Sequence, residues 1–335
     1  MEGIKTVVDP RVELLSIIQL FSDYGKKHRP LTEFNSSYVQ RIKDYFSPFQ
    51  EHKAISIYSQ LISTGFNFSH PMDFILDVEF DLESNSLSLI KSVGESTVKS
   101  AGGLHQLELL THFLTDFANQ TIFSHFFTTN ESFYKAIVEE VKEDLLGMNI
   151  TKAFEEYYGV QYQRFYLVLN PLCDPGGYGI WKQCINGKLA AYSITGPVRE
   201  EDGLLYFVNE PEGLCIFNWH EFGHSMVNPL TTRYLQEINV FEKLFAPSEK
   251  QMKSQAYGSW EICLNEHIVR AVVIRLITRE LGEKRAQELL EYEKSIGFYL
   301  LEPLIEWLKT YEKNRSIYMN FAEYYPSILS LLVKL

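Results

Sequence analysis

The sequence predicts an α+β protein that is predominantly helical, with a small antiparallel or mixed sheet placed just before one apolar helix. Three observations lead to this class. Apolar residues recur at the spacing of amphipathic helices over most of the chain. A shorter stretch, residues 165–208, instead alternates aromatic and β-branched runs with turn residues. Residues 218–226, which follow it, contain the pattern His-Glu-x-x-His.

The first half of the chain is expected to be helical. Its helices are predicted at residues 12–24, 38–46, 51–63, 105–127 and 133–146. Residues 77–93 lack this periodicity and are expected to be strand-like or irregular. We expect residues 1–158 to form a helical part and residues 159–335 to form the part that carries the chemistry, both packed as one compact unit.

The pattern changes near Gly159. Four strands are predicted, at residues 165–169, 178–184, 189–195 and 204–208. Asn186-Gly187, between the second and third strands, is typical of a two-residue hairpin turn. A small sheet therefore precedes the helix that carries the two histidines.

That helix has signals at both ends. Pro211 and the acidic residues beside it indicate a helix start, and Asn228-Pro229 predicts a stop soon after His224. The chain after it is expected to be helical. Its helices are predicted at residues 230–245, from Gly258 to about Leu281-Gly282, at 283–311 with a break at Gly297 or Pro303, and at 321–335 with an interruption at Pro326.

The histidine pair has the spacing of metal ligands. Each residue of an α-helix turns by about 100°, so positions four apart lie about 40° apart around the axis. His220 and His224 can therefore bind one metal ion. Glu221 is rotated by about 100° from His220, close enough to reach a water on that ion but poorly placed to ligate it. The alternative is a helix whose two histidines are only hydrogen-bonded in a core.

A third ligand must come from elsewhere, and with it a zinc ion would keep an open position for water. A histidine six residues after the motif would indicate a metzincin, but Leu230 stands there. The helix that opens near Gly258 offers three candidates, Glu261, Glu266 and His267.

This later helix resembles the third-ligand helix of the gluzincins, the zinc peptidases typified by thermolysin and the zinc aminopeptidases. Asn265-Glu266 matches their Asn-Glu pair, which implies Glu266 as the zinc ligand in a zincin-like fold. Tyr257 stands nine residues before Glu266, which matches the spacing of the tyrosine that stabilises the oxyanion in thermolysin; Tyr324 and Tyr325 are alternatives. Arg270 is a departure, because thermolysin has an aspartate there that orients a zinc-bound histidine.

The chain as a whole is similar to an uncharacterised family of bacterial His-Glu-x-x-His proteins. Three stretches carry this similarity: residues 9–15, the His220 helix with its trailing Val227-Asn228-Pro229, and the Glu266 helix. The similarity implies only a zinc-peptidase role.

Composition excludes several classes of function. A net charge of −12 argues against a nucleic-acid partner. The sequence has no run of 18 apolar residues, the length needed to span a membrane. Without the basic and apolar regions of a signal peptide, the chain is expected to stay in the cytoplasm or to have lost such a peptide. The four widely spaced cysteines suit buried free thiols. His105 and His112 share a helix face, but no acid or cysteine is placed to complete a second metal site with them.

The sequence thus predicts a zinc-dependent metallopeptidase acting on a peptide or protein, with Glu221 as general base and His220, His224 and Glu266 as ligands. Three alternatives stay open: a zincin-fold metal- or peptide-binding protein without turnover, a hydrolase of another bond on the same site, and a helical scaffold without metal. Intact Glu221 argues against the first of these.

Overall fold

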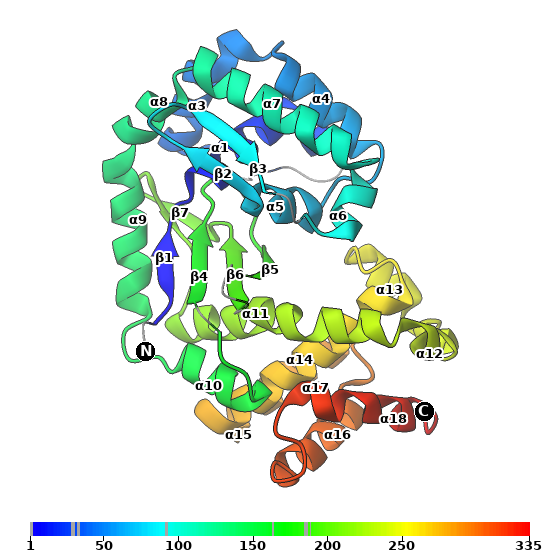
Figure 1. Ribbon diagram of the computed structural model, residues 1–335. Helices are drawn as coiled ribbons and strands as arrows, with labels where there is room; N and C mark the ends of the chain where they lie inside the picture. The colour runs from blue at the N-terminus through cyan, green and yellow to red at the C-terminus, as the bar shows by residue number, and fades with distance from the viewer. Residues whose placement is uncertain are drawn as a thin grey trace. The chain divides into compact units, whose positions relative to one another are not determined.

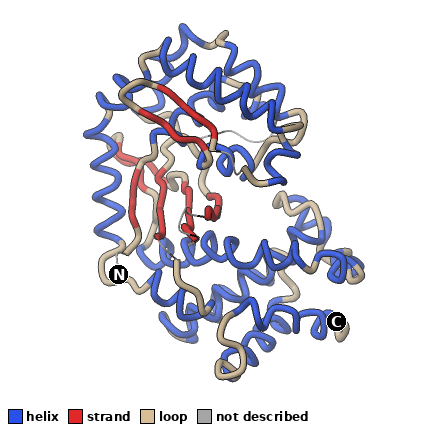
Figure 2. Tube along the Cα trace, in the orientation of Figure 1, coloured by secondary structure: helices blue, strands red, loops and turns tan. Residues whose placement is uncertain are grey.

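A computed structural model describes residues 3–27, 31, 34–90, 93–162, 164–183, 187 and 189–335. Helices dominate this part of the chain, and its short strands all precede residue 207 (Figures 1 and 2), which confirms the predicted class. The chain divides into two compact units. The first consists of Met1–Leu146, Tyr166–Lys182 and Tyr192–Leu214, and the second of Gly147–Phe165, Gln183–Ala191 and Cys215–Leu335.

This division differs from the predicted one, which placed a boundary at residue 158 within a single compact unit. Side chains from three strands of the central sheet join the core of the N-terminal helices, as shown by buried Val168, Ile180 and Ile194. The helix at Ile150–Tyr158, which precedes these strands in sequence, instead packs against helices of the C-terminal part. Sheet strands therefore belong to the first unit although they follow a helix of the second in sequence.

Among its described residues, the first unit contains nine helices, five whole strands and part of three more. Its helices are α1 (Pro10–Phe21), α2 (Tyr24–Lys27), α3 (Ser37–Phe46), α4 (Lys53–Ile62), α5 (Ser69–Leu76), α6 (Glu95–Ser100), α7 (Leu104–Gln120), α8 (Phe123–Thr129) and α9 (Glu131–Asp144), with a 3₁₀ turn at Ser47–Phe49. Its strands are β1 (Lys5–Val7), β2 (Val78–Asp81), β3 (Ser86–Leu89), β4 (Arg164–Leu169), β5 (Gly177–Gln183), β6 (Leu189–Thr195), β7 (Arg199–Glu201) and β8 (Leu204–Tyr206). The unit boundaries fall within β4, β5 and β6.

Helix α1 is the central element of this unit's core. Asp9 caps its first turn by accepting a hydrogen bond from the Arg11 amide, and Pro10 fits the first position because it needs no amide partner. Apolar residues lie almost all round α1, so it is buried, as expected for a helix without a polar face. Residues 77–93, for which a strand-like or irregular stretch was expected, contain the hairpin of β2 and β3, and β3 packs against α7.

A four-stranded sheet has the order β1-β4-β6-β5. Strand β1 lies parallel to β4, with Thr6 opposite Leu167. Strand β1 was not predicted, because three residues are too few to show an alternating pattern. Strand β7, which pairs with β8 in an antiparallel ribbon, was not predicted either. The predicted turn residue Asn186 lies outside the described residues.

The predicted helix at residues 105–127 is two helices. It breaks between α7 and α8 at Ile122, whose φ of 49° lies in the left-handed region. A β-branched residue adopts this conformation at a cost, so packing on either side must impose it. Phe117 and Phe123, which flank the break, are fully buried.

The second unit is helical. It contains α10 (Ile150–Tyr158), most of α11 (Pro211–Arg233), α12 (Leu235–Asn239), α13 (Glu249–Ser254), α14 (Trp260–Glu280), α15 (Glu283–Ser295), α16 (Leu301–Lys313), α17 (Phe321–Tyr324) and α18 (Ile328–Leu332), with 3₁₀ turns at Glu242–Phe245 and Tyr325–Ser327. The predicted break at Gly297 is confirmed, since its φ of 111° ends the run between α15 and α16.

Helix α14 is the centre of this unit and packs against α10, α12, α15 and α16 (Figure 1). Ser259 caps its first turn. Arg275 joins it to α16 through two hydrogen bonds to the Glu312 carboxylate, of 2.9 and 2.7 Å. Because α14 is buried along most of its length, its few polar side chains, including that of Glu266, face other buried groups.

No helix among the described residues is long and apolar enough to cross a membrane. The three described cysteines, Cys173, Cys215 and Cys263, are buried thiols, as predicted.

One buried acid in the first unit stands apart from the ordinary core. Glu13 on α1 accepts a hydrogen bond from the Tyr38 hydroxyl, which lies 2.6 Å from the hydroxyl of Tyr134. Its second carboxyl oxygen is buried without a hydrogen-bond partner. Burial raises the pKa of Glu13 to about 7, although the Tyr38 hydrogen bond works in the opposite direction.

We expect Glu13 to make the folded state less stable as pH rises. The folded protein holds the Glu13 proton up to pH 7 while the unfolded chain loses it near pH 4.5, so this group's contribution falls by about 3 kcal/mol across that range. Urea unfolding at several pH values should show the wild type losing this much relative to Glu13→Gln, which mimics the protonated acid. Exposed Glu51→Gln is the control, and parallel curves for wild type and Glu13→Gln would refute the expectation.

Candidate metal centre

Helix α11 presents the two histidines on one face. It begins at Pro211, as predicted, and runs through the motif without a break. Its neighbours fix its rotation: the Trp219 indole donates a hydrogen bond of 3.0 Å to the Ile150 carbonyl oxygen, and the Phe222 ring packs on Phe165. With these two side chains buried in the helical unit, His220 and His224 are left 16% and 12% exposed.

The predicted stop at Asn228-Pro229 is wrong, because α11 continues through Pro229 to Arg233. A proline removes one backbone hydrogen bond from the helix, and burial of the residues around it compensates. Val227 and Thr231 are fully buried, and the Thr231 hydroxyl lies 2.6 Å from that of Tyr325. The extra turn keeps Asn228 in helical position, four residues after His224.

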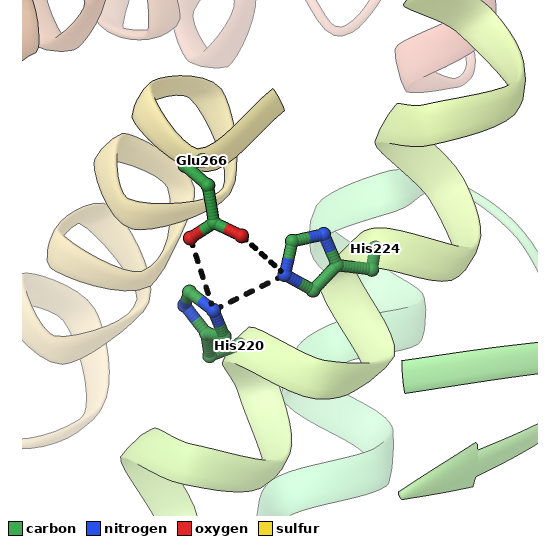
Figure 3. Close-up of side chains that lie close together, drawn as sticks. All are labelled: His220, His224 and Glu266. Carbon is green, nitrogen blue, oxygen red and sulfur yellow. Dashed lines mark hydrogen bonds and ion pairs between the residues drawn. The ribbon is translucent and has the colours of Figure 1, made fainter. Parts of the chain in front are cut away.

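Glu266 on α14 meets the two histidines (Figure 3). Its carboxylate oxygens lie 3.5 Å from His220 Nε2 and 3.4 Å from His224 Nε2, and the two Nε2 atoms are 3.1 Å apart. Among the described residues these three form the one group of His, Cys, Asp and Glu arranged to hold a metal ion.

The other two candidates on α14 lie elsewhere. Glu261 accepts a hydrogen bond of 2.9 Å from the Thr232 hydroxyl. His267 is fully buried, with Nδ1 2.8 Å from the Cys263 carbonyl oxygen and its ring against Phe298. Of the three, only Glu266 therefore points at the histidines. His105 and His112, considered for a second site, are exposed.

The three donors fit a small cation. Ligand atoms about 2.0–2.1 Å from a tetrahedral zinc ion lie about 3.3 Å from one another, close to the separations of 3.1 to 3.5 Å found here. Glu266 Oε2 is buried without a hydrogen-bond partner, which a native structure rarely tolerates unless an ion or water completes the site. The residues present thus suit a metal ion, and their role as ligands stays a prediction.

Hydrogen bonds orient both rings. His224 Nδ1 lies 3.2 Å from the Asn228 amide oxygen, which can only accept, so its hydrogen is on Nδ1 and its Nε2 lone pair points toward Glu266 and His220. His220 Nδ1 lies 3.2 Å from Arg270 Nη1, which can only donate, so the hydrogen of His220 is on Nε2, between the two rings. To bind an ion through Nε2, a neutral His220 would have to carry this hydrogen on Nδ1 instead, and Arg270 Nη1 would have to turn away from that nitrogen.

Charge in the site is partly balanced by Arg270, one turn after Glu266 on α14. Burial lowers the pKa of His220 well below its ordinary value, and Arg270 and His224 add to the effect, so His220 is neutral and able to ligate. Burial also opposes the charge of Arg270, but the nearby anions Glu266, Glu293 and Glu221 outweigh it and keep its pKa raised.

Tyr257 stands at the edge of this group. Its hydroxyl accepts a hydrogen bond of 3.1 Å from Arg270 Nη2 and keeps its own hydrogen to donate. Burial raises its pKa, and the charges of Glu266 and Glu221 act in the same direction, so it stays protonated at neutral pH. Arg270 Nη2 thus lies between the Tyr257 hydroxyl and Glu266 Oε2, which is 3.4 Å from the same nitrogen.

The two later tyrosines are engaged away from this group. The Tyr324 hydroxyl donates to the Trp307 carbonyl oxygen at 2.8 Å, and that of Tyr325 pairs with Thr231. Of the tyrosines considered for oxyanion stabilisation, Tyr257 is the one that contacts the polar groups of the site.

Gly223, inside the motif, sets the distance between the helices. A methyl group at this position would lie 3.1 Å from Val269 Cγ1 on α14 and 3.3 Å from the Tyr158 hydroxyl, closer than side chains normally pack. Sequence reasoning did not use this residue, although a glycine in a helix interior is unfavourable and so signals a close approach.

Sequence reasoning also missed Glu293 on α15, which contacts Arg270. Its position carried a signal, because Ala286, Leu290 and Glu293 follow helical spacing and are all buried. An acid on the apolar face of a helix needs a buried partner.

Fold and site together define a helical α+β protein with a candidate metal centre of two histidines and a glutamate. The chain belongs to the family described as a domain of unknown function, DUF4932, whose model matches residues 4–331. Comparison with curated proteins and with solved structures gives no match. The resemblance to the gluzincins therefore stays a prediction.

We expect the protein to bind one zinc ion through these residues. Zinc at 100 times its Kd should stabilise the wild type by about 2.7 kcal/mol in thermal or urea unfolding. Glu266→Ala should weaken binding by about 100-fold or more, since it removes a ligand rather than a residue that only supports one. Glu261→Ala, on the same helix, is the matched control. Equal zinc affinity for Glu266→Ala and Glu261→Ala would remove Glu266 from the site.

Gly223→Ala should lower zinc affinity by about 10-fold, because the added methyl group displaces α14 and its carboxylate. Gly213→Ala is the control on α11: a methyl group there meets only Val208 Cγ2, at 3.9 Å, and should leave zinc affinity unchanged.

A second substitution, Val269→Ala, should restore zinc binding to Gly223→Ala by removing the clashing methyl groups. Isothermal titration with zinc measures the Kd of the wild type, Gly223→Ala, Gly213→Ala and Gly223→Ala/Val269→Ala. If Gly223→Ala binds zinc as the wild type does, the helix contact does not set the ligand spacing.

Proposed function

We propose that this protein is a zinc-dependent hydrolase of peptide bonds. One observation carries the proposal: His220, His224 and Glu266 converge from two helices with the separations of a tetrahedral site, and Glu221 follows His220 directly on α11. Two nitrogens and one carboxylate leave a position for water, which distinguishes a catalytic zinc site from a closed structural one.

When bound, zinc would lower the pKa of a water molecule and polarise the substrate carbonyl. Glu221 would accept a proton from the attacking water as the water oxygen bonds to the carbonyl carbon. Glu221 would then pass this proton to the amide nitrogen as the C–N bond breaks, so that a carboxylic acid and an amine leave. These roles match the geometry of the helix, in which Glu221 is rotated by about 100° from His220.

Tyr257 would stabilise the negative oxygen that develops on the attacked carbonyl. Its hydroxyl keeps a hydrogen to donate, because the bond from Arg270 is made to its oxygen. Its raised pKa keeps that hydrogen in place at the pH of the reaction. Removal of one such donor commonly lowers kcat by about 10² to 10³-fold.

A peptide-library cleavage assay tests the proposal. Wild-type protein should cleave, lose activity with a chelator and regain it with zinc. Glu221→Gln should retain zinc but lose about 10²- to 10⁴-fold in kcat, because the general base is gone and the ligands are intact. Glu237→Gln, at an exposed position of α12, is the control and should cleave as the wild type does.

Two results would contradict this function. Equal cleavage by wild type and Glu221→Gln would remove Glu221 from the reaction. Zinc binding by a wild type that cleaves no peptide would identify a metal-binding protein without peptidase activity.

A further inference from the structure

A buried glutamate behind the candidate metal centre has no part in the reaction described so far. Glu293 on α15 is 10% exposed, and its Oε2 lies 3.3 Å from Arg270 Nε. Arg270 in turn lies 3.4 Å from Glu266 Oε2 through Nη2. One guanidinium is therefore shared between two carboxylates, and one of these is a proposed metal ligand.

These two ion pairs are held by proximity rather than by directed hydrogen bonds. Arg270 Nε, Glu266 Oε2 and Glu293 Oε2 are each buried without a hydrogen-bond partner. The guanidinium is fixed instead by hydrogen bonds to the Tyr257 hydroxyl and to His220 Nδ1, at 3.1 and 3.2 Å, and by the face of the Phe298 ring, 4.2 Å from Cζ. Arg270 thus keeps its place while its charge is divided between two anions.

Charge counting shows why a second anion is needed. A divalent cation on Glu266 would compete with Arg270 for that carboxylate and would repel the guanidinium, since at about 4 Å two unit charges interact by several kcal/mol inside a protein. Arg270 would then depend on Glu293 as its remaining ion-pair partner among the described residues. A buried cation without a partner is strongly unfavourable.

We propose that Glu293 is a positioning residue for the metal centre: by pairing with Arg270, it frees the Glu266 carboxylate to bind the metal ion. This inference rests on the proposed zinc site. In this arrangement Arg270 competes with the metal ion for the Glu266 carboxylate, and Glu293 weakens that competition by pairing with Arg270.

Zinc affinity of chelator-treated protein tests the proposal by isothermal titration. Glu293→Gln should raise the Kd for zinc by about 10- to 100-fold, because Arg270 then has only Glu266 as an anionic partner. Glu291→Gln, two residues earlier on α15 and 58% exposed, is the matched control and should bind as the wild type does. Glu293→Asp, which keeps the charge, should lie between wild type and Glu293→Gln.

The same substitution in a second background separates this role from a merely structural one. In Arg270→Met the competitor is absent, so adding Glu293→Gln should leave the Kd unchanged, a coupling that independent sites do not show. Thermal unfolding of each zinc-free variant shows which of them fold. If Glu293→Gln alone is unfolded, the zinc Kd of Arg270→Met is compared with that of Arg270→Met/Glu293→Gln instead.

Three outcomes overturn the proposal. If the wild type binds no zinc, both this inference and the proposed function fall. If the wild type binds zinc and Glu293→Gln binds it equally well, only this inference falls. The same holds if Glu293→Gln weakens binding equally in the wild-type and Arg270→Met backgrounds, because Glu293 would then act without Arg270.

Discussion

The close approach of α14 to α11 at Gly223 is the contact on which the candidate site depends. The axes of packed helices lie about 8–10 Å apart, and the side chains at the contact decide where in that range they fall. Val269, which meets Gly223, is three residues after Glu266 and therefore on the same side of α14. Because Gly223 has no side chain, α14 lies close enough to α11 for the Glu266 carboxylate oxygens to be 3.5 and 3.4 Å from the two imidazole Nε2 atoms.

Behind this contact the second unit buries charge that its core alone would not favour. Glu266, Arg270 and Glu293 are each no more than 14% exposed, and two of them are anions. Buried charges are usually retained when each has a partner, and here the anions outnumber the guanidinium. A bound cation would restore the balance, so the excess of negative charge and the convergence of two histidines and a glutamate that could hold a metal ion point to the same chemistry.

Local sequence patterns correctly predicted those features that depend only on a short stretch of chain. Helical periodicity placed His220 and His224 on one face, and Pro211 marked the start of their helix correctly. The choice among Glu261, Glu266 and His267 depends on the rotation of α14 about its axis, which packing decides, so spacing alone left it open and the Asn265-Glu266 resemblance favoured Glu266. At Pro229 a reliable local rule failed because burial of Val227 and Thr231 outweighed the lost hydrogen bond. The three residues of β1 pair with a strand far along the chain and carry no pattern of their own.

The donor set also bears on which ions the centre can discriminate against. Calcium prefers six to eight oxygen ligands at about 2.3–2.6 Å, and magnesium keeps most of its water in a nearly regular octahedron. Two ring nitrogens held 3.1 Å apart, with one carboxylate against them, offer those hard ions too few oxygens. Borderline ions that accept imidazole are favoured instead, so selection among cations would already be built into the packing of two helices.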